Sequence, residues 1–251
     1  MSGNETVADA DEYWRRYYAE QFRFGLGTED ILAALMTIPP VQTWVDLGCG
    51  SESMLWAIAL RAQQLVAVDV DRTRLEILGQ FAELAQPRGV HTTALALCGR
   101  AQPDDFLARC RSLVVRVRAD CLDRSLPADL TATTFDLVTQ FGLLGLCRND
   151  EHFTTRFAEI HRLLAPGGWT AGANWVARDP RGRVELTHQL YQNAATQAGA
   201  HLLLLKRITI ADPEFPAVWT YVGRTQPCPQ AEPLSHQNQA SCSSPRSGSR
   251  I

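Results

Sequence analysis

The chain has 251 residues, of which 45% are apolar and 20% charged, and its net charge at pH 7 is −3. This length suits one α/β domain with a sizeable core, and the negative charge argues against a protein that binds nucleic acid or an anionic membrane through a general positive field. The seven cysteines form no Cys-x-x-Cys pair, and the histidines show no metal-ligand spacing, so no metal site is expected. The polar N-terminus has no signal-peptide core, and we expect a cytoplasmic protein.

The first elements in the chain are predicted to be helices, and a strand–helix repeat follows them. Residues 12–22 alternate aromatic and charged side chains as a helix does, and Thr28-Glu29-Asp30 can cap a second helix that runs to about Met36. Four segments then alternate between the strand and helix patterns: strand 43–47, helix 51–63, strand 65–69 and helix 71–85. This order predicts a parallel sheet with helices on both faces.

Residues 86–112 interrupt this rhythm and are predicted to be an insertion with one short helix from Asp104 to Arg111. The elements expected after it are strands 113–117 and 135–139, helix 151–164, a turn at 165–168, strand 169–175, helix 184–197 and an antiparallel pair of strands, 201–210 and 217–222. Together they predict a doubly wound, Rossmann-like α/β domain over 41–225, with a seven-stranded, mostly parallel sheet and an antiparallel last strand. The polar segment 226–251 is expected to be a disordered tail.

A glycine loop lies between the first predicted strand and its helix, with the sequence Asp46-Leu47-Gly48-Cys49-Gly50. Glycine lets the backbone approach a ligand at the carboxyl end of a parallel sheet. Asp69 follows Gly50 by 19 residues, at the end of the next strand, where an acid can hold both hydroxyls of a ribose. A glycine loop followed by an acid at the end of the next strand is common to dinucleotide sites and S-adenosylmethionine (SAM) sites. The alternative is that the glycines form a purely structural turn.

Two neighbouring residues favour SAM over a dinucleotide. Ser53 stands where the third glycine of a dinucleotide motif would fall, and Glu52 lies at the helix start that a pyrophosphate would approach. SAM carries a sulfonium and an ammonium, which acidic groups such as Asp46 suit. The expected cofactor is therefore SAM, with S-adenosylhomocysteine (SAH) as product.

Three later motifs add weight to this prediction. Asp120 and Cys121 follow the third strand, where the aspartate can accept from an adenine amino group and Cys121 can supply a backbone N–H; a helix cap or turn aspartate is the alternative. Gln140 and Phe141 end the fourth strand and should lie beneath the methyl group. Residues 164–169 match the L-x-P-G-G turn before the fifth strand of many SAM methyltransferases.

With these motifs the sequence resembles the nicotinamide, phenylethanolamine and indolethylamine N-methyltransferases, a branch of the class I methyltransferases. The resemblance covers about residues 12–225. Residues 12–18, Glu-Tyr-Trp-Arg-Arg-Tyr-Tyr, look like the D-Y-L-x-x-Y-Y element that closes over the cofactor in that branch, and residues 22–25, 86–112 and 219–224 are similar to further family features. The resemblance implies an N-terminal helical lid over 1–40, although the aromatic residues of 12–22 also suit an amphipathic core helix.

The resemblance and the motifs together define the expected site. The expected cofactor-binding residues are Tyr13, Tyr18, Asp46, Gly48, Cys49, Gly50, Asp69, Val70, Arg74, Asp120, Cys121 and Gln140. The expected substrate-binding residues are Phe141, Leu144, Asn174 and Arg178. No catalytic base is expected, because methyl transfer can be accelerated by positioning and by the exclusion of water.

The predicted acceptor is a small molecule, methylated on a nitrogen of an amine, an amino acid or a heteroaromatic ring. Leu144 and Asn174 align with aspartates of the nicotinamide enzyme, which argues against nicotinamide itself and simple arylalkylamines. Arg178, Arg181 and Arg183 either bind a carboxylate or lie in a solvated loop. O- or C-methylation and an inactive SAM-binding protein are the alternatives.

Two other enzyme classes fit the sequence less well. A nucleic-acid methyltransferase is disfavoured because residues 139–142 lack an (N/D)-P-P-(Y/F) turn, and a nicotinamide-dependent oxidoreductase by Ser53 and the Pro-Gly-Gly of 166–168. We expect no nucleic-acid or membrane partner, and a monomer or weak homodimer.

Overall fold

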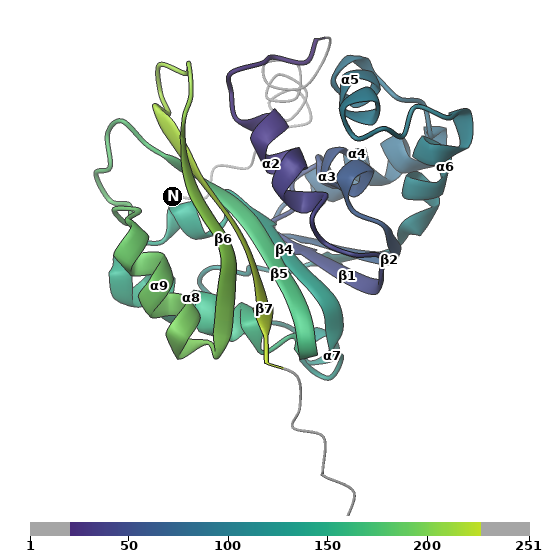
Figure 1. Ribbon diagram of the computed structural model, residues 1–251. Coiled ribbons are helices and arrows are strands. Elements are labelled where there is room, and N and C mark those ends of the chain that lie inside the picture. Colours follow the sequence, from purple (N-terminus) through teal and green to yellow (C-terminus); the bar gives the residue numbers. More distant parts are fainter. Residues whose placement is uncertain (1–20, 227–251) are drawn as a thin grey trace, which may run out of the picture.

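The computed structural model describes residues 21–226, and in them a seven-stranded sheet separates two layers of helices (Figure 1). The strands lie in the order β3-β2-β1-β4-β5-β7-β6. Their bounds are β1 Val41–Leu47, β2 Ala62–Asp69, β3 Leu113–Arg118, β4 Phe135–Phe141, β5 Leu164–Val176, β6 Ala200–Thr209 and β7 Ala217–Thr225. Strands β1 to β5 are parallel, and β7 runs antiparallel between β5 and β6. The predicted Rossmann-like fold is confirmed.

Each face of the sheet has its own layer of helices and its own apolar core (Figure 1). One layer holds α2 Thr28–Leu35, α3 Ser53–Ala59, α4 Arg72–Leu84, α5 Gly89–Leu97 and α6 Pro103–Ser112. The other holds α7 Ala128–Thr131, α8 Asp150–His161 and α9 His188–Gln197, while the short 3-10 helix η1, Leu144–Leu146, follows β4. Among the described residues no helix has the length and apolar character needed to cross a membrane.

Three predicted helix boundaries are wrong, each for a local physical reason. The helix expected over 51–63 is shorter and spans only α3, Ser53–Ala59. All seven residues of α3 are buried, so the spacing of apolar residues does not show where the helix begins or ends. The helix expected to reach 164 ends at His161, since Leu164 already pairs with Phe135 and the Pro-Gly-Gly turn forms an irregularity inside β5. Helix α9 begins at His188 rather than near 184, because the Thr187 hydroxyl caps it by accepting from Leu190 N at 3.2 Å.

The insertion over 86–112 contains two helices, whereas the residue pattern predicts only the second. Helix α5 is held by His91, whose ring lies 4.8 Å from that of Phe81 and 5.4 Å from that of Phe106, centroid to centroid. Burial lowers the pKa of His91 to about 4, so the ring packs there uncharged. In the same layer the cap of α2 is Gly27, with φ 86°, and not Thr28.

Candidate active site

The glycine loop joins β1 to α3 at the carboxyl edge of the parallel strands. Gly48 and Gly50 have φ of 63° and 56°, in the left-handed region that favours glycine. Cys49 N donates to Val68 O at 3.0 Å, and Gly50 N donates to the Asp69 carboxylate at 2.8 Å. These bonds bring the predicted loop and the predicted ribose aspartate together in one site.

Asp69 fixes the loop and keeps acceptor capacity for a ligand. Its Oδ2 accepts from Gly50 N, and its Oδ1 accepts from Asp71 N at 2.8 Å. Each carboxylate oxygen has a second lone pair, which is the arrangement that two neighbouring ribose hydroxyls require. The next residue, Val70, is 57% exposed and offers an apolar surface to a flat base.

Asp46 lies entirely inside the protein and braces three elements. Its Oδ1 accepts from the Thr139 hydroxyl of β4 at 2.7 Å, and its Oδ2 accepts from the Ser53 hydroxyl of α3 at 2.6 Å. Trp44 Nε1 donates to the same Thr139 oxygen at 2.7 Å. Burial raises the pKa of Asp46 to about 6. The buried carboxyl therefore fixes the start of the glycine loop against α3 and β4.

Glu52 is a site residue whose position the sequence analysis did not foresee. Its carboxyl folds back over the loop, where it accepts from Ser51 N at 3.1 Å and from the Ser51 hydroxyl at 2.5 Å. A Cβ placed on Gly50 would meet Glu52 Oε2 at 2.5 Å. Burial raises the pKa of Glu52 to about 7, and the Arg74 guanidinium opposes this shift. In the sequence this acid stands two residues after Gly50, where it argues against a pyrophosphate but does not show that it folds back over the loop.

The charges around the loop fit SAM and disfavour a pyrophosphate. Burial raises the pKa values of Asp46, Glu52 and Asp69; the charge of Asp69 acts on the other two carboxyls, and the Arg74 guanidinium acts on Glu52 and Asp69. A sulfonium and an ammonium would stabilise the ionised carboxylates, whereas phosphate oxygens would add like charge. Arg74 lies at the edge of this group, with its Nε 3.9 Å from Asp71 Oδ2.

Asp120 closes a turn directly after β3. Its Oδ1 accepts from Leu122 N at 3.0 Å and from Asp123 N at 2.9 Å. These are the hydrogen bonds of an aspartate that stabilises a turn, which was the alternative to adenine binding. Among the described residues its Oδ2 has no partner, so one oxygen is left for an adenine amino group. Cys121 beside it is buried, which raises the pKa of its thiol to about 12.

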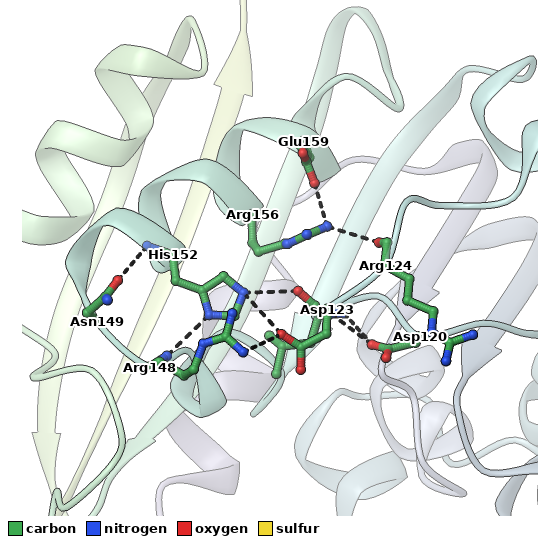
Figure 2. Close-up of polar contacts among 9 residues, drawn as sticks. Asp120, Asp123, Arg124, Arg148, Asn149, His152, Arg156 and Glu159 are labelled. Atoms are coloured by element: carbon green, nitrogen blue, oxygen red, sulfur yellow. Dashed lines mark hydrogen bonds and ion pairs between the residues drawn. The ribbon is translucent and has the colours of Figure 1, made fainter.

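Contacts with α8 hold the Asp120 turn in place (Figure 2). His152 Nε2 lies 3.0 Å from Leu122 O, and Arg148 pairs with the Asp123 carboxylate at 3.0 Å. His152 Nδ1 accepts from Arg148 N at 3.3 Å, so the neutral ring with its hydrogen on Nε2 satisfies both contacts. The position of the turn therefore depends on the helical layer that contains α8, whose core also includes Cys121.

The amides of Gln140 and Asn174 are bound internally, at the ends of β4 and β5. Gln140 Oε1 accepts from Leu144 N at 3.1 Å, and Asn174 Oδ1 accepts from the next amide, Gly145 N, at 2.9 Å. Gln140 Nε2 donates to Tyr221 OH at 3.4 Å and Asn174 Nδ2 to Tyr191 OH at 2.8 Å. Both residues are 0% exposed, and their amides hold the start of η1.

The four expected substrate residues divide into two groups. Leu144 and Asn174 are 0% exposed, whereas Phe141 and Arg178 reach accessible space. Phe141 stacks on Trp56 of α3, with ring centroids 4.4 Å apart and planes 20° apart. Arg178 borders a cavity of about 200 Å³ beyond the carboxyl end of β5. Tyr13 and Tyr18 lie outside the described residues.

A Rossmann-like sheet with a glycine loop, an aspartate at the end of β2 and buried acids around that loop is typical of SAM-binding α/β enzymes. Residues 45–171 match the family model described as a methyltransferase domain, and the chain belongs to this family. The protein is a SAM-dependent methyltransferase. No curated protein matches the sequence.

Solved methyltransferase structures share this fold at low sequence identity. One is the magnesium protoporphyrin IX methyltransferase ChlM from Synechocystis PCC 6803 with bound SAM, with a TM-score of 0.57 and 14% identity over 89% of this chain and 93% of that one. Another is the N-methyltransferase NodS from Bradyrhizobium japonicum WM9 in complex with SAH, with a TM-score of 0.53 and 16% identity over 86% and 98%. At these identities the likeness shows the fold alone.

Proposed function

We propose that the protein transfers a methyl group from SAM to a nitrogen of a small-molecule acceptor: an amine, an amino acid or a heteroaromatic ring. One observation carries the proposal. The segments at the carboxyl ends of β4 and β5, residues 140–147 and 174–177, contain no Asp, Glu, His or Lys. Their two polar side chains, Gln140 and Asn174, are buried and engaged with η1 and with tyrosines. An acceptor that brings its own free lone pair, as an uncharged nitrogen does, suits such a site.

Positioning then supplies the catalysis. SAM, when bound, provides an electrophilic methyl group on its sulfonium. The stacked pair of Trp56 and Phe141 forms an apolar wall that keeps water from the acceptor side, while η1 is held rigid by the two buried amides. Holding two reactants in line can be worth an effective molarity on the order of 10⁵ M. A phenol or alcohol acceptor would also need a group to remove its proton.

The proposed cofactor contacts are those that the geometry favours. They are the backbone of Gly48, Cys49 and Gly50, the carboxylates of Asp69 and Asp120, the apolar surface of Val70, the Cys121 backbone and the Arg74 side chain at the edge. The Tyr13–Tyr18 lid and the link to the nicotinamide, phenylethanolamine and indolethylamine branch stay predictions. The choice of a small molecule over nucleic acid, the cytoplasmic location and the oligomeric state also stay predictions.

Product analysis tests the proposal. The full chain is incubated with SAM bearing a ¹³C-labelled methyl group and with matched sets of amines, phenols and carbon nucleophiles, and labelled products are identified by mass spectrometry and NMR. We expect labelled N-methyl products together with stoichiometric SAH. Products labelled only on oxygen or carbon would contradict the proposal.

A further inference from the structure

The cavity beyond β5 contains two arginines with unused binding capacity. Arg178 and Arg183 border it, and neither guanidinium has a hydrogen-bond or ion-pair partner among residues 21–226. Arg181 lies in the same loop but differs, because its Nε donates to both oxygens of Asp179, at 2.9 and 2.8 Å. The loop thus has one arginine that is neutralised by its own neighbour and two that are available to a ligand.

The loop that carries these arginines is fixed by backbone hydrogen bonds. Arg178 N donates to Glu214 O at 2.9 Å, in the connection between β6 and β7. Arg183 N donates to Pro180 O at 2.8 Å, and Val184 N donates to Cys147 O at 2.6 Å, just after η1. Because two of these bonds anchor the loop to other segments and the third closes a turn within it, the cavity is formed before a ligand arrives, which lowers the ordering cost of binding.

The rest of the cavity wall is mainly apolar. It includes Trp175, Val176, Val184 and Leu186, together with one acid, Glu185. A volume of about 200 Å³ accommodates a carboxylate with a ring or short chain attached. The two arginines and one glutamate leave a single net positive charge, which matches a monocarboxylate.

The cavity adjoins the acceptor side of the proposed active site. Gly145 of η1 and Trp175 of β5 both line it. A Cβ on Gly142, the residue after Phe141, would lie 3.9 Å from the Trp175 ring. An elongated molecule could therefore place one end in this cavity and the other beside Phe141.

We propose that Arg178 and Arg183 bind the carboxylate of the methyl acceptor, so that the substrate is an apolar or aromatic monocarboxylic acid whose nitrogen lies at its other end. This inference rests on the proposed function and names its substrate class. Guanidinium groups bind carboxylates through paired N–H donors, and the apolar wall strengthens such bonds by excluding water. An uncharged amide of the same shape loses this attraction.

Binding measured without turnover tests the inference. The full chain saturated with SAH is titrated, by ligand-observed NMR, with 4-aminobenzoate, 4-aminophenylacetate and 3-(4-aminophenyl)propanoate, whose nitrogen and carboxylate lie at opposite ends, and with the primary amide of each. We expect at least one acid to bind at least 10-fold more tightly than its amide. Arg178→Gln and Arg183→Gln should each weaken that acid about 10-fold, from the loss of a charged hydrogen bond. Arg181→Gln is the matched control and should bind as the wild type does.

Three results would overturn the inference: no acid binds, amides bind as well as acids, or the Arg181 variant weakens binding as much as the other two. Calorimetric titration of SAH on the same samples separates this failure from a failure of the proposed function. If SAH binds normally and the acids do not, the carboxylate site alone is wrong. If SAH does not bind the wild type, the cofactor site and with it the proposed function are wrong. Circular dichroism of each variant confirms that the exposed substitutions leave the fold intact.

Discussion

The carboxylate of Asp69 accepts a hydrogen bond from the backbone N–H of Gly50 at 2.8 Å. The residue placed to hold the ribose therefore also sets the shape of the glycine loop. One side chain links the end of β2 to the turn after β1, and a change there should affect both the loop and the ligand.

The first prediction concerns this carboxylate. Asp69→Asn replaces one acceptor oxygen by an NH₂ group, which faces either Gly50 N or Asp71 N and removes a charged acceptor from the ribose. Because a charged hydrogen bond contributes about 1.5–3 kcal/mol, SAH affinity should fall about 10- to 100-fold. Isothermal titration calorimetry measures the change.

Asp136→Asn is the matched control. Asp136 Oδ2 also accepts two backbone N–H groups, from Gln42 at 3.0 Å and Thr43 at 2.9 Å, but at the amino end of β4. This variant should lose stability and bind SAH as the wild type does. Unchanged SAH affinity in the Asp69 variant would remove Asp69 from the cofactor site.

The second prediction concerns the pH dependence of stability at Glu52. Burial raises the pKa of Glu52 from 4.5 to about 7, so the folded state holds this proton more tightly than the unfolded state does. The stabilisation is complete below pH 4.5 and is lost as the pH rises through about 7. Glu52→Gln does not titrate, so its stability relative to the wild type should increase between pH 5 and pH 8, by at most about 3 kcal/mol.

Urea unfolding of both proteins across this pH range provides the measurement. Asp46 and Asp69 titrate in both proteins, so most of their contribution cancels in the difference. Parallel stability curves for the two proteins would show that Glu52 is ionised in the folded state without penalty.

The third prediction concerns the amide–tyrosine pair behind η1. Tyr191→Phe removes the hydroxyl that accepts from Asn174 Nδ2 at 2.8 Å and leaves that buried N–H without a partner. The cost should be about 1–3 kcal/mol of unfolding free energy. Since Asn174 also holds Gly145 N, kcat should fall more than SAH affinity. Urea unfolding and steady-state kinetics test both effects, and equal losses in kcat and SAH affinity would argue against a role in positioning η1.

The fourth prediction compares two glycines on β5 and η1. A Cβ at Gly172 would lie 2.4 Å from Gln140 O and 2.7 Å from Gln140 Nε2, whereas at Gly145 the nearest atom would be 3.5 Å away. Gly172→Ala must push β4 and β5 apart and should cost about 1–3 kcal/mol or more, while Gly145→Ala should change stability by less than about 1 kcal/mol. Thermal unfolding of the two variants measures this difference in stability. Equal melting temperatures would contradict the close approach of β4 and β5 at Gly172.

Much of the fold could be predicted because its signals are local. Buried strand runs, amphipathic helices and the positive-φ glycines at 48 and 50 depend on a few neighbouring residues. The predicted ends of helices were wrong where the local residue pattern carries no information about them. Helix α3 is apolar all round, and the Pro-Gly-Gly segment is drawn into β5 by pairing with β4.

The hydrogen-bond partners of the buried polar side chains come from residues that are distant in the sequence. The sequence did not indicate that the Asp46 carboxyl accepts from the hydroxyl of Thr139, 93 residues later, inside the protein. In the same way the tyrosines of α9 and β7 occupy the amides of Asn174 and Gln140. Of three arginines with the same sequence context, only Arg181 is neutralised by a neighbour.

The sequence by itself determined the class of this protein, because the glycine loop, the acid after the second strand and the strand–helix order are each encoded within short segments. Only the tertiary structure decided which of the candidate residues face a ligand. A polar side chain turns inward or outward according to the partners that distant elements bring to it, and burial without a partner is costly. The cofactor was therefore predictable from local pattern, whereas only the folded loop after β5 distinguished Arg178 and Arg183, which border a cavity, from Arg181, which pairs with Asp179.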